Sequence, residues 1–326
     1  PAAGAPAAAG EAQVQIQFVV DPLMMCHYYF KDYGPGSTKP GSKSGVDLSS
    51  EANAYVQAEK LVEDPAAWTW LEERIVSKPD VPSLRKALAD PPAQFRDDDT
   101  KTAFSMVADA LEQGCPGYQK TVFPTESIGV NRLAISARKR LRPSESRLTS
   151  TLMKSMDFKP IDAPISVYVV TRTGGRGTWG KGDRGYYTVI GAYGQSPSSL
   201  LETGIHEATH VLDAMQPYET ESVLQAVRKG VKPDQKKDAE TFLHGLITFN
   251  AGELVKRFVN HTYVHQGIQA PDHADEYRPY LSTYQYIWVD YLDGKMTRDQ
   301  ISKKLIDEFE AVRKLQAGQQ QKKKAS

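Results

Sequence analysis

The sequence predicts an α+β protein that is mostly helical and contains a small mixed sheet. Long stretches in which apolar residues recur every three to four positions are typical of amphipathic helices. Two short segments rich in β-branched and aromatic residues, 165–170 and 186–193, are typical of strands. Between the second strand and the C-terminal helices lies segment 200–215, which carries two histidines four residues apart. We expect the functional residues to lie in this segment.

Composition excludes several classes of protein. A chain of 326 residues can bury a sizeable core, in one large or two modest domains. Forty basic and forty acidic residues cancel, so the net charge does not indicate nucleic acid or an anionic membrane as a partner. No apolar run reaches the roughly 18 residues that suggest a membrane span. We therefore expect a soluble protein.

The N-terminal residues and the cysteines bear on location. Residues 1–11 are almost entirely Ala, Pro and Gly, which predicts a flexible leader. The first residue is Pro1, and small residues are favoured at signal-peptide cleavage sites, so we expect a mature secreted or periplasmic protein, although a shortened chain would begin in the same way. Cys26 and Cys115 are too few for a disulfide scaffold. We interpret both as core residues that could form one bridge in an exported chain.

Residues 12–160 are expected to form a mainly helical N-terminal region that supports the site without supplying chemistry. A strand is predicted at 14–20, where apolar and polar residues alternate at first, and a loop rich in Gly and Pro at 33–47. Gly and Pro at 90–92 and 114–117 are expected to separate helices. The predicted helices span 50–62, 65–76, 81–88, 101–111 and 128–156, the last with breaks around Pro143.

Residues 161–317 are expected to hold the site. Strands are predicted at 165–170 and 186–193, and the glycine-rich segment between them, 174–185, is expected to be a mobile connection because it lacks the Ser or Thr of a phosphate loop. Helices are predicted at 200–215, 239–259 and 297–317, the last opened by a Thr297 and Gln300 capping box. Residues 318–326, with three consecutive lysines, are expected to be a disordered basic tail.

Segment 200–215 has the start, the periodicity and the end of a helix. Apolar residues recur along it with a helical period and predict one buried stripe. Ser199 followed three residues later by Glu202 matches a capping box, and Pro217 is expected to end the helix.

Its centre reads His206-Glu207-Ala208-Thr209-His210, an HExxH motif. Residues four apart lie on one face of a helix, so both imidazoles can bind one metal ion. Glu207 can take a proton from water held at the open position of that metal.

This motif, preceded by a strand, resembles the zincin metallopeptidases, and specifically the gluzincin branch, whose third zinc ligand is a glutamate from a later helix. Residues 244–253 are also similar to a segment of poorly characterised secreted bacterial proteins of that type. The resemblance covers roughly 165–305 and implies a zincin-like fold, Zn²⁺ as cofactor, and a peptide or protein substrate. It also implies that 186–193 is the edge strand that pairs with the substrate backbone.

A catalytic zinc generally needs a third protein ligand. Glu253 is preferred, because Ala251 and Gly252 before it would let two helices approach closely and because the resemblance implies a glutamate. The sequence departs from the best-known gluzincin pattern, since Gly252 precedes the glutamate and Lys256-Arg257 follow it. His244 therefore stays as a competing ligand. The two candidates are nine residues apart on one predicted helix, so only one can face the metal.

The hypothesised reaction is amide hydrolysis with Glu207 as general base. A Tyr or His is expected to stabilise the oxyanion, and Tyr280 and His273 are weak candidates among many. Asp213, three residues past His210, could orient a ligand histidine, although a solvated carboxylate is an equal interpretation. The alternative hypothesis is a non-catalytic exported binding or scaffold protein that kept the zincin-like fold.

Overall fold

The computed structural model describes residues 14–32, 47–78, 80–173, 178–183, 185–217, 221–269 and 277–325. Most of these residues are helical, and four strands form one small mixed sheet, as the sequence predicts. The chain divides into two compact units, which are described separately here. The first comprises residues 1–15, 143–162 and 212–326, and the second comprises residues 16–142 and 163–211.

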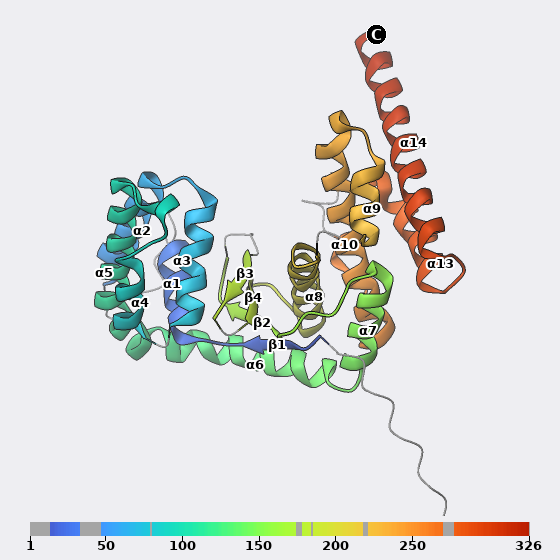
Figure 1. The fold of residues 1–326 in the computed structure, drawn as a ribbon. Coiled ribbons are helices and arrows are strands. Elements are labelled where there is room, and N and C mark those ends of the chain that lie inside the picture. Colours follow the sequence, from blue (N-terminus) through green and yellow to red (C-terminus); the bar gives the residue numbers. More distant parts are fainter. Residues whose placement is uncertain are drawn as a thin grey trace, which may run out of the picture. The chain divides into compact units, whose positions relative to one another are not determined.

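The sheet belongs to the second unit and has the strand order β1-β2-β4-β3 (Figure 1). Strands β1, β2 and β4 are parallel, and β3 is antiparallel to β4. The strands predicted at 14–20, 165–170 and 186–193 are confirmed, with small shifts of their ends. The bounds are Ile16–Val19 for β1, Ile165–Val170 for β2, Thr178–Gly182 for β3 and Gly185–Gly191 for β4.

Strand β3 corrects two expectations. It lies within segment 174–185, which was expected to be a connection only, and it makes β4 an inner strand instead of the edge. The free edge of β3 faces helix α3 (Pro65–Ser77), where the backbone N–H groups of Lys181 and Asp183 donate to Glu73 and Ser77. An extended peptide therefore cannot pair with residues 186–189, because β2 and β3 already occupy both sides of the strand there.

Helices surround the sheet in the second unit, and Figure 1 shows α6 running beneath it, in contact with β1 and β2. The expected separation at 114–117 is wrong, because α5 continues through Pro116. Gly114 serves packing there, since a Cβ would overlap the ring of Phe30. The remaining helices are α1 (Pro22–Asp32), α2 (Ser49–Leu61), α4 (Val81–Leu88), α5 (Asp98–Thr121) and α6 (Phe123–Leu141).

Helices α1 and α5 are joined by a disulfide between Cys26 and Cys115, whose Cα atoms are 5.8 Å apart. Both cysteines are buried, as expected for core residues, and the bridge that the sequence left open is present. A bridge that closes a loop of this length stabilises a fold by about 2 to 5 kcal/mol, mainly by restricting the unfolded chain.

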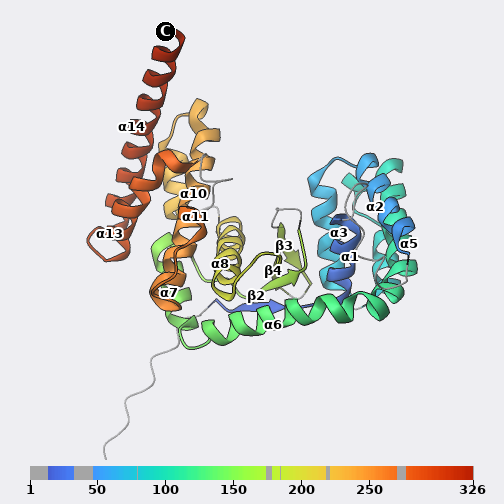
Figure 2. The same ribbon diagram turned by 180° about the vertical axis from the view of Figure 1, so that it is seen from behind.

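The first unit is built from helices around an aromatic core. Figure 2 shows α14 lying beside α9, and the two helices are in contact. Inside, Trp288 donates to Asn250 at 2.9 Å and Tyr284 donates to the carbonyl of Phe242 at 2.7 Å, which fixes α10 against the following segment. The elements are α7 (Glu145–Met156), α9 (Val223–Gly230), α10 (Lys236–Phe258), α11 (Gln266–Gln269), a π-helical turn (Thr283–Trp288), α13 (Val289–Leu292) and α14 (Arg298–Ala325).

The C-terminal helix α14 begins as the sequence predicts and extends further than expected. The Thr297 and Gln300 capping box is confirmed, because each side chain accepts from the backbone N–H of the other residue. Helix α14 then continues to Ala325, so the expected disordered tail at 318–326 is wrong for its helical residues.

The predicted leader at 1–11 and most of the predicted loop at 33–47 lie outside the described residues. Among the described helices, none has the length and apolar character needed to cross a membrane.

Candidate metal centre

Helix α8 (Pro197–Ala214) presents the HExxH motif. Its start is capped by Ser196 and Ser199, which exchange backbone-to-hydroxyl hydrogen bonds of 2.7 and 3.1 Å, so the capping box lies three residues before the predicted one. Gly204 allows α8 to lie directly on the sheet, because a Cβ there would be 2.9 Å from the ring of Phe18. The buried stripe of the helix consists of Leu200, Leu201, Ile205, Ala208, Val211 and Leu212.

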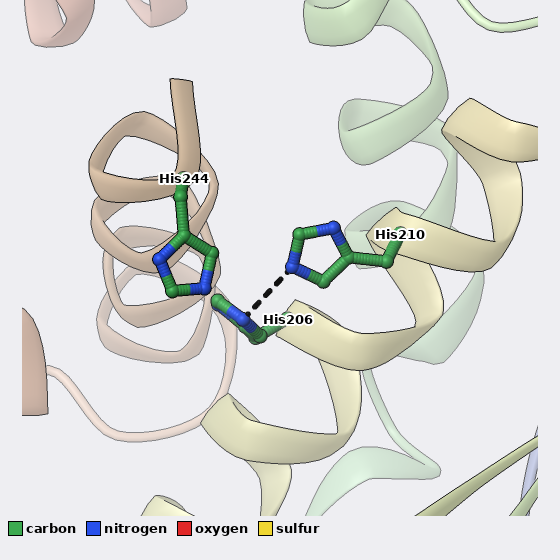
Figure 3. A group of neighbouring side chains, drawn as sticks. All are labelled: His206, His210 and His244. Carbon is green, nitrogen blue, oxygen red and sulfur yellow. Dashed lines mark hydrogen bonds between the residues drawn. The ribbon is translucent and has the colours of Figure 1, made fainter. Parts of the chain in front are cut away.

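His206 and His210 are only partly buried, and their side chains point toward each other (Figure 3). Their Nε2 atoms are 3.1 Å apart. Two nitrogens that each lie about 2.0–2.1 Å from a tetrahedral zinc are about 3.3 Å apart, so this pair already has almost the required separation. The two nitrogens share a hydrogen bond in the structure, and each could donate its lone pair to a metal once neither carries the proton between them.

His244 on α10 completes the group. One ring nitrogen from each of His206, His210 and His244 lies within 4.8 Å of the other two, and Figure 3 shows the three rings converging from two helices. The side chain of His244 is exposed. Three imidazoles are a ligand set that catalytic zinc sites use, with one position left for water.

Glu207 lies next to this group, with a carboxylate oxygen 3.9 Å from Nε2 of His206. Its side chain is 12 % exposed, and burial raises its pKa to about 7. Among the described residues, no Lys or Arg forms an ion pair with it. A divalent cation at the three histidines would supply the missing positive charge and lower that pKa. The residues present therefore fit a zinc ion.

Glu253, the preferred third ligand from the sequence, lies elsewhere. Its carboxylate accepts from Arg257 at 2.8 Å and is 3.9 Å from Nε2 of His265. Gly252 permits the close approach of His265, since a Cβ at this position would overlap that side chain. The small residue before Glu253 thus serves packing within the first unit instead of an approach to the metal helix. Among the described residues, the group that could hold a metal ion contains His244 and not Glu253.

The two weak candidates for oxyanion stabilisation gain no support. Tyr280 is buried, and its ring packs against Phe242 and Phe309 with centroids 4.9 and 6.1 Å away. It acts there as a core residue. His273 lies outside the described residues.

An ion-pair bridge that sequence reasoning missed connects the two helices that carry the histidines. Arg228 on α9 donates to Asp213 at 2.7 Å and makes two hydrogen bonds, of 2.8 and 3.1 Å, to Glu240. Asp213 lies three residues after His210, and Glu240 lies four residues before His244. Asp213 therefore holds an arginine, and its other oxygen is buried and accepts no hydrogen bond from a described residue. The only sequence signal was charge at these spacings, which surface helices also show.

Comparison with known protein families, with characterised proteins and with solved structures found no match. The resemblance to zincins stays a prediction that rests on the motif.

Proposed function

We propose that the protein is a zinc-dependent peptidase in which His206, His210 and His244 hold the metal and Glu207 acts as general base. One observation carries the proposal: three imidazole nitrogens lie within 4.8 Å of one another beside a carboxylate that has no cationic partner among the described residues. The three side chains converge on one point, as the ligands of a single metal ion do.

The mechanism assigns one task to each group. A bound Zn²⁺ would act as a Lewis acid toward a carbonyl and lower the pKa of water. Glu207 accepts a proton from the attacking water and returns it to the departing amine, a role suited to a carboxylate that lies beside the histidine group. The sheet and the buried stripe of α8 keep the histidine face of that helix in place. Arg228 links the turns that flank His210 and His244.

The decisive experiment replaces Glu207 by Gln. We expect the variant to bind one equivalent of zinc as the unmodified protein does, while hydrolysis of a labelled, denatured protein falls about 100- to 10,000-fold. The double variant with His206→Ala and His210→Ala is the matched control and should bind no zinc at the site. Unchanged hydrolysis by Glu207→Gln would overturn the proposed base. If the unmodified protein binds zinc but hydrolyses nothing, the non-catalytic alternative stands instead.

An exported location is part of the proposal. The Cys26–Cys115 disulfide supports it, because such bridges persist in oxidising compartments and are rare in the cytoplasm. Labelling of free thiols before and after reduction in protein isolated from its host tests this. We expect no accessible thiol before reduction and two after it.

A further inference from the structure

A second candidate site lies in the unit that contains the sheet. A cavity of about 450 Å³ is lined by α6 and by the segments that follow strands β2 and β4. None of the three metal-site histidines lines it. Loops at the carboxyl ends of parallel strands meet at one edge of a sheet, where α/β proteins commonly bind ligands. The volume is in the range of small-molecule sites.

The exposed surface of the cavity is mainly apolar, although six of its eleven lining residues carry a polar group: Glu126, Arg132, Ser136, Thr171, Tyr193 and Gln195. Val130 and Leu133 of α6 form one side, and Ala192 and Pro197 form the other. Tyr193 also lines the cavity, and its side chain is 73 % exposed. Such a surface suits an apolar or aromatic body, and the polar groups then decide which ligand is accepted.

Glu126 is the polar group of interest. Thr171 and Tyr118 donate to the same carboxylate oxygen, Oε2, at 3.1 and 3.3 Å. The other oxygen, Oε1, accepts no hydrogen bond from any described residue and is not among the fully enclosed atoms. Glu126 lines this cavity and also a smaller one beside α1. One oxygen is therefore held in position by two hydrogen bonds, while the other has no hydrogen-bond partner among the described residues.

The charge of Glu126 lacks a close partner. Burial raises its pKa, and hydrogen bonds from Thr171 and Tyr118 together with the charge of Arg172 oppose that effect only in part. Arg172 places its guanidinium 4.4 Å from the ring centre of Tyr193, and no ion pair joins it to Glu126 among the described contacts. A half-buried carboxylate of this kind gains more from a bound cation than a solvated one does.

We propose that this cavity binds a primary amine carried on a short apolar or aromatic stem. The ammonium group meets Oε1 of Glu126, and the stem lies against Val130 and Leu133. Arg132 also lines the cavity, but it is exposed, so solvent and salt screen its repulsion of a cation. The proposal is independent of the metal centre, and either can fail without the other.

The first test measures binding of three ligands of similar size to the full chain by calorimetry at pH 7, with chelator present so that no metal contributes. Phenethylamine is the cation, 2-phenylethanol the neutral analogue and phenylacetate the anion. We expect phenethylamine to bind at least about ten-fold more tightly than 2-phenylethanol. Glu126→Gln should remove this preference, whereas the exposed control Glu63→Gln should retain it.

The second test fills the cavity without relying on charge. Gly129 lines the cavity on α6, and a Cβ there would meet no atom within 4 Å. Gly129→Leu should therefore fold, gain helix propensity and lose phenethylamine binding, whereas Gly129→Ala should fold equally well and keep it. Thermal unfolding of both variants provides the folding control.

Three outcomes would overturn the proposal. Phenethylamine that binds no better than 2-phenylethanol would remove the role of Glu126. Unchanged binding to Gly129→Leu would place the amine elsewhere. Tighter binding of phenylacetate, lost in Arg132→Gln, would make the cavity an anion site.

Discussion

Two glutamates in the same compact unit, Glu72 and Glu207, are both removed from solvent but carry opposite pKa shifts. Burial disfavours ionisation of Glu72, but His27 and Lys31 outweigh burial and lower its pKa to about 2. Burial acts unopposed on Glu207 and raises its pKa to about 7. The counter-charge, more than the degree of burial, therefore decides which acid is structural and which is poised for chemistry.

The contacts of Glu72 explain its structural role. Its Oε1 accepts from Lys31 at 2.7 Å and from Tyr28 at 3.1 Å, and it is 3.6 Å from Nε2 of His27. Burial lowers the pKa of His27, and its other ring nitrogen is 3.0 Å from the hydroxyl of Tyr55. Helices α1, α2 and α3 are joined by this network close to the disulfide. Glu207 has no comparable set of partners among the described residues.

The largest expected effect is on the affinity for zinc, the cation proposed to bind beside Glu207. His244→Ala should lower zinc affinity about 1,000-fold, or ~4 kcal/mol, because it removes one of three ligands. Glu253→Gln should leave the affinity within a few-fold, since Glu253 is paired with Arg257. Competition with a chromophoric chelator measures both variants. The reverse ranking would restore Glu253 as the third ligand.

The next effect concerns the acid that already has partners. Glu72→Gln should lower the free energy of unfolding by about 3 kcal/mol, because it breaks a buried charge network and leaves Lys31 without its counter-charge. Urea unfolding of the metal-free protein measures this. The exposed-residue variant Glu63→Gln should match the unmodified protein. A loss below about 1 kcal/mol for Glu72→Gln would show that the network contributes little.

Glu72 and Glu207 should make the free energy of unfolding change with pH in opposite directions. The pKa of Glu72 is about 2 in the fold against a model value of 4.5, so its stabilisation is present above pH 4.5 and is lost as the pH falls toward 2. The pKa of Glu207 is about 7 against 4.5, so the free energy of unfolding decreases as the pH rises from 4.5 through 7.

In chelator, Glu207→Gln should therefore stabilise the protein by about 2 kcal/mol at pH 8 and by almost nothing at pH 4.5. Urea unfolding at both pH values measures the difference. Equal effects at the two values would mean that Glu207 is already compensated. Saturating zinc should weaken the gain at pH 8, because the cation then stabilises the carboxylate.

The smallest effect concerns the link between the two ligand-bearing helices. Arg228→Gln should weaken zinc binding about ten-fold, because supporting residues around a metal site typically contribute 10- to 100-fold to affinity. Arg313→Gln is the matched control, since it removes another ion pair to α10, with Asp238, but has no contact with α8. Equal zinc affinity in the two variants would remove Arg228 from the site.

Local patterns predicted most elements well. The predicted ends of the helix at 81–88 and of the strand at 165–170 match the structure to the residue. Both segments have a clear apolar periodicity and are bounded by residues typical of turns and loops. Strand β3 escaped prediction, since a segment with so many glycines has no intrinsic strand preference and is held by pairing with β4 and by contacts with α3. Helix α5 was predicted too short because tertiary packing around Gly114 overrode the local signals of Gly and Pro.

The sequence by itself determined the helix that carries His206, Glu207 and His210, because a spacing of four residues places both imidazoles on one face wherever that helix lies. Which residue is the third ligand of the proposed metal site depends on the tertiary structure. His244 and Glu253 lie on different faces of one helix, and the choice depends on how α10 is rotated. Asn250 accepts a hydrogen bond from Trp288 and Glu240 pairs with Arg228, so residues outside α10 hold it in place, and local patterns within the helix do not reveal them.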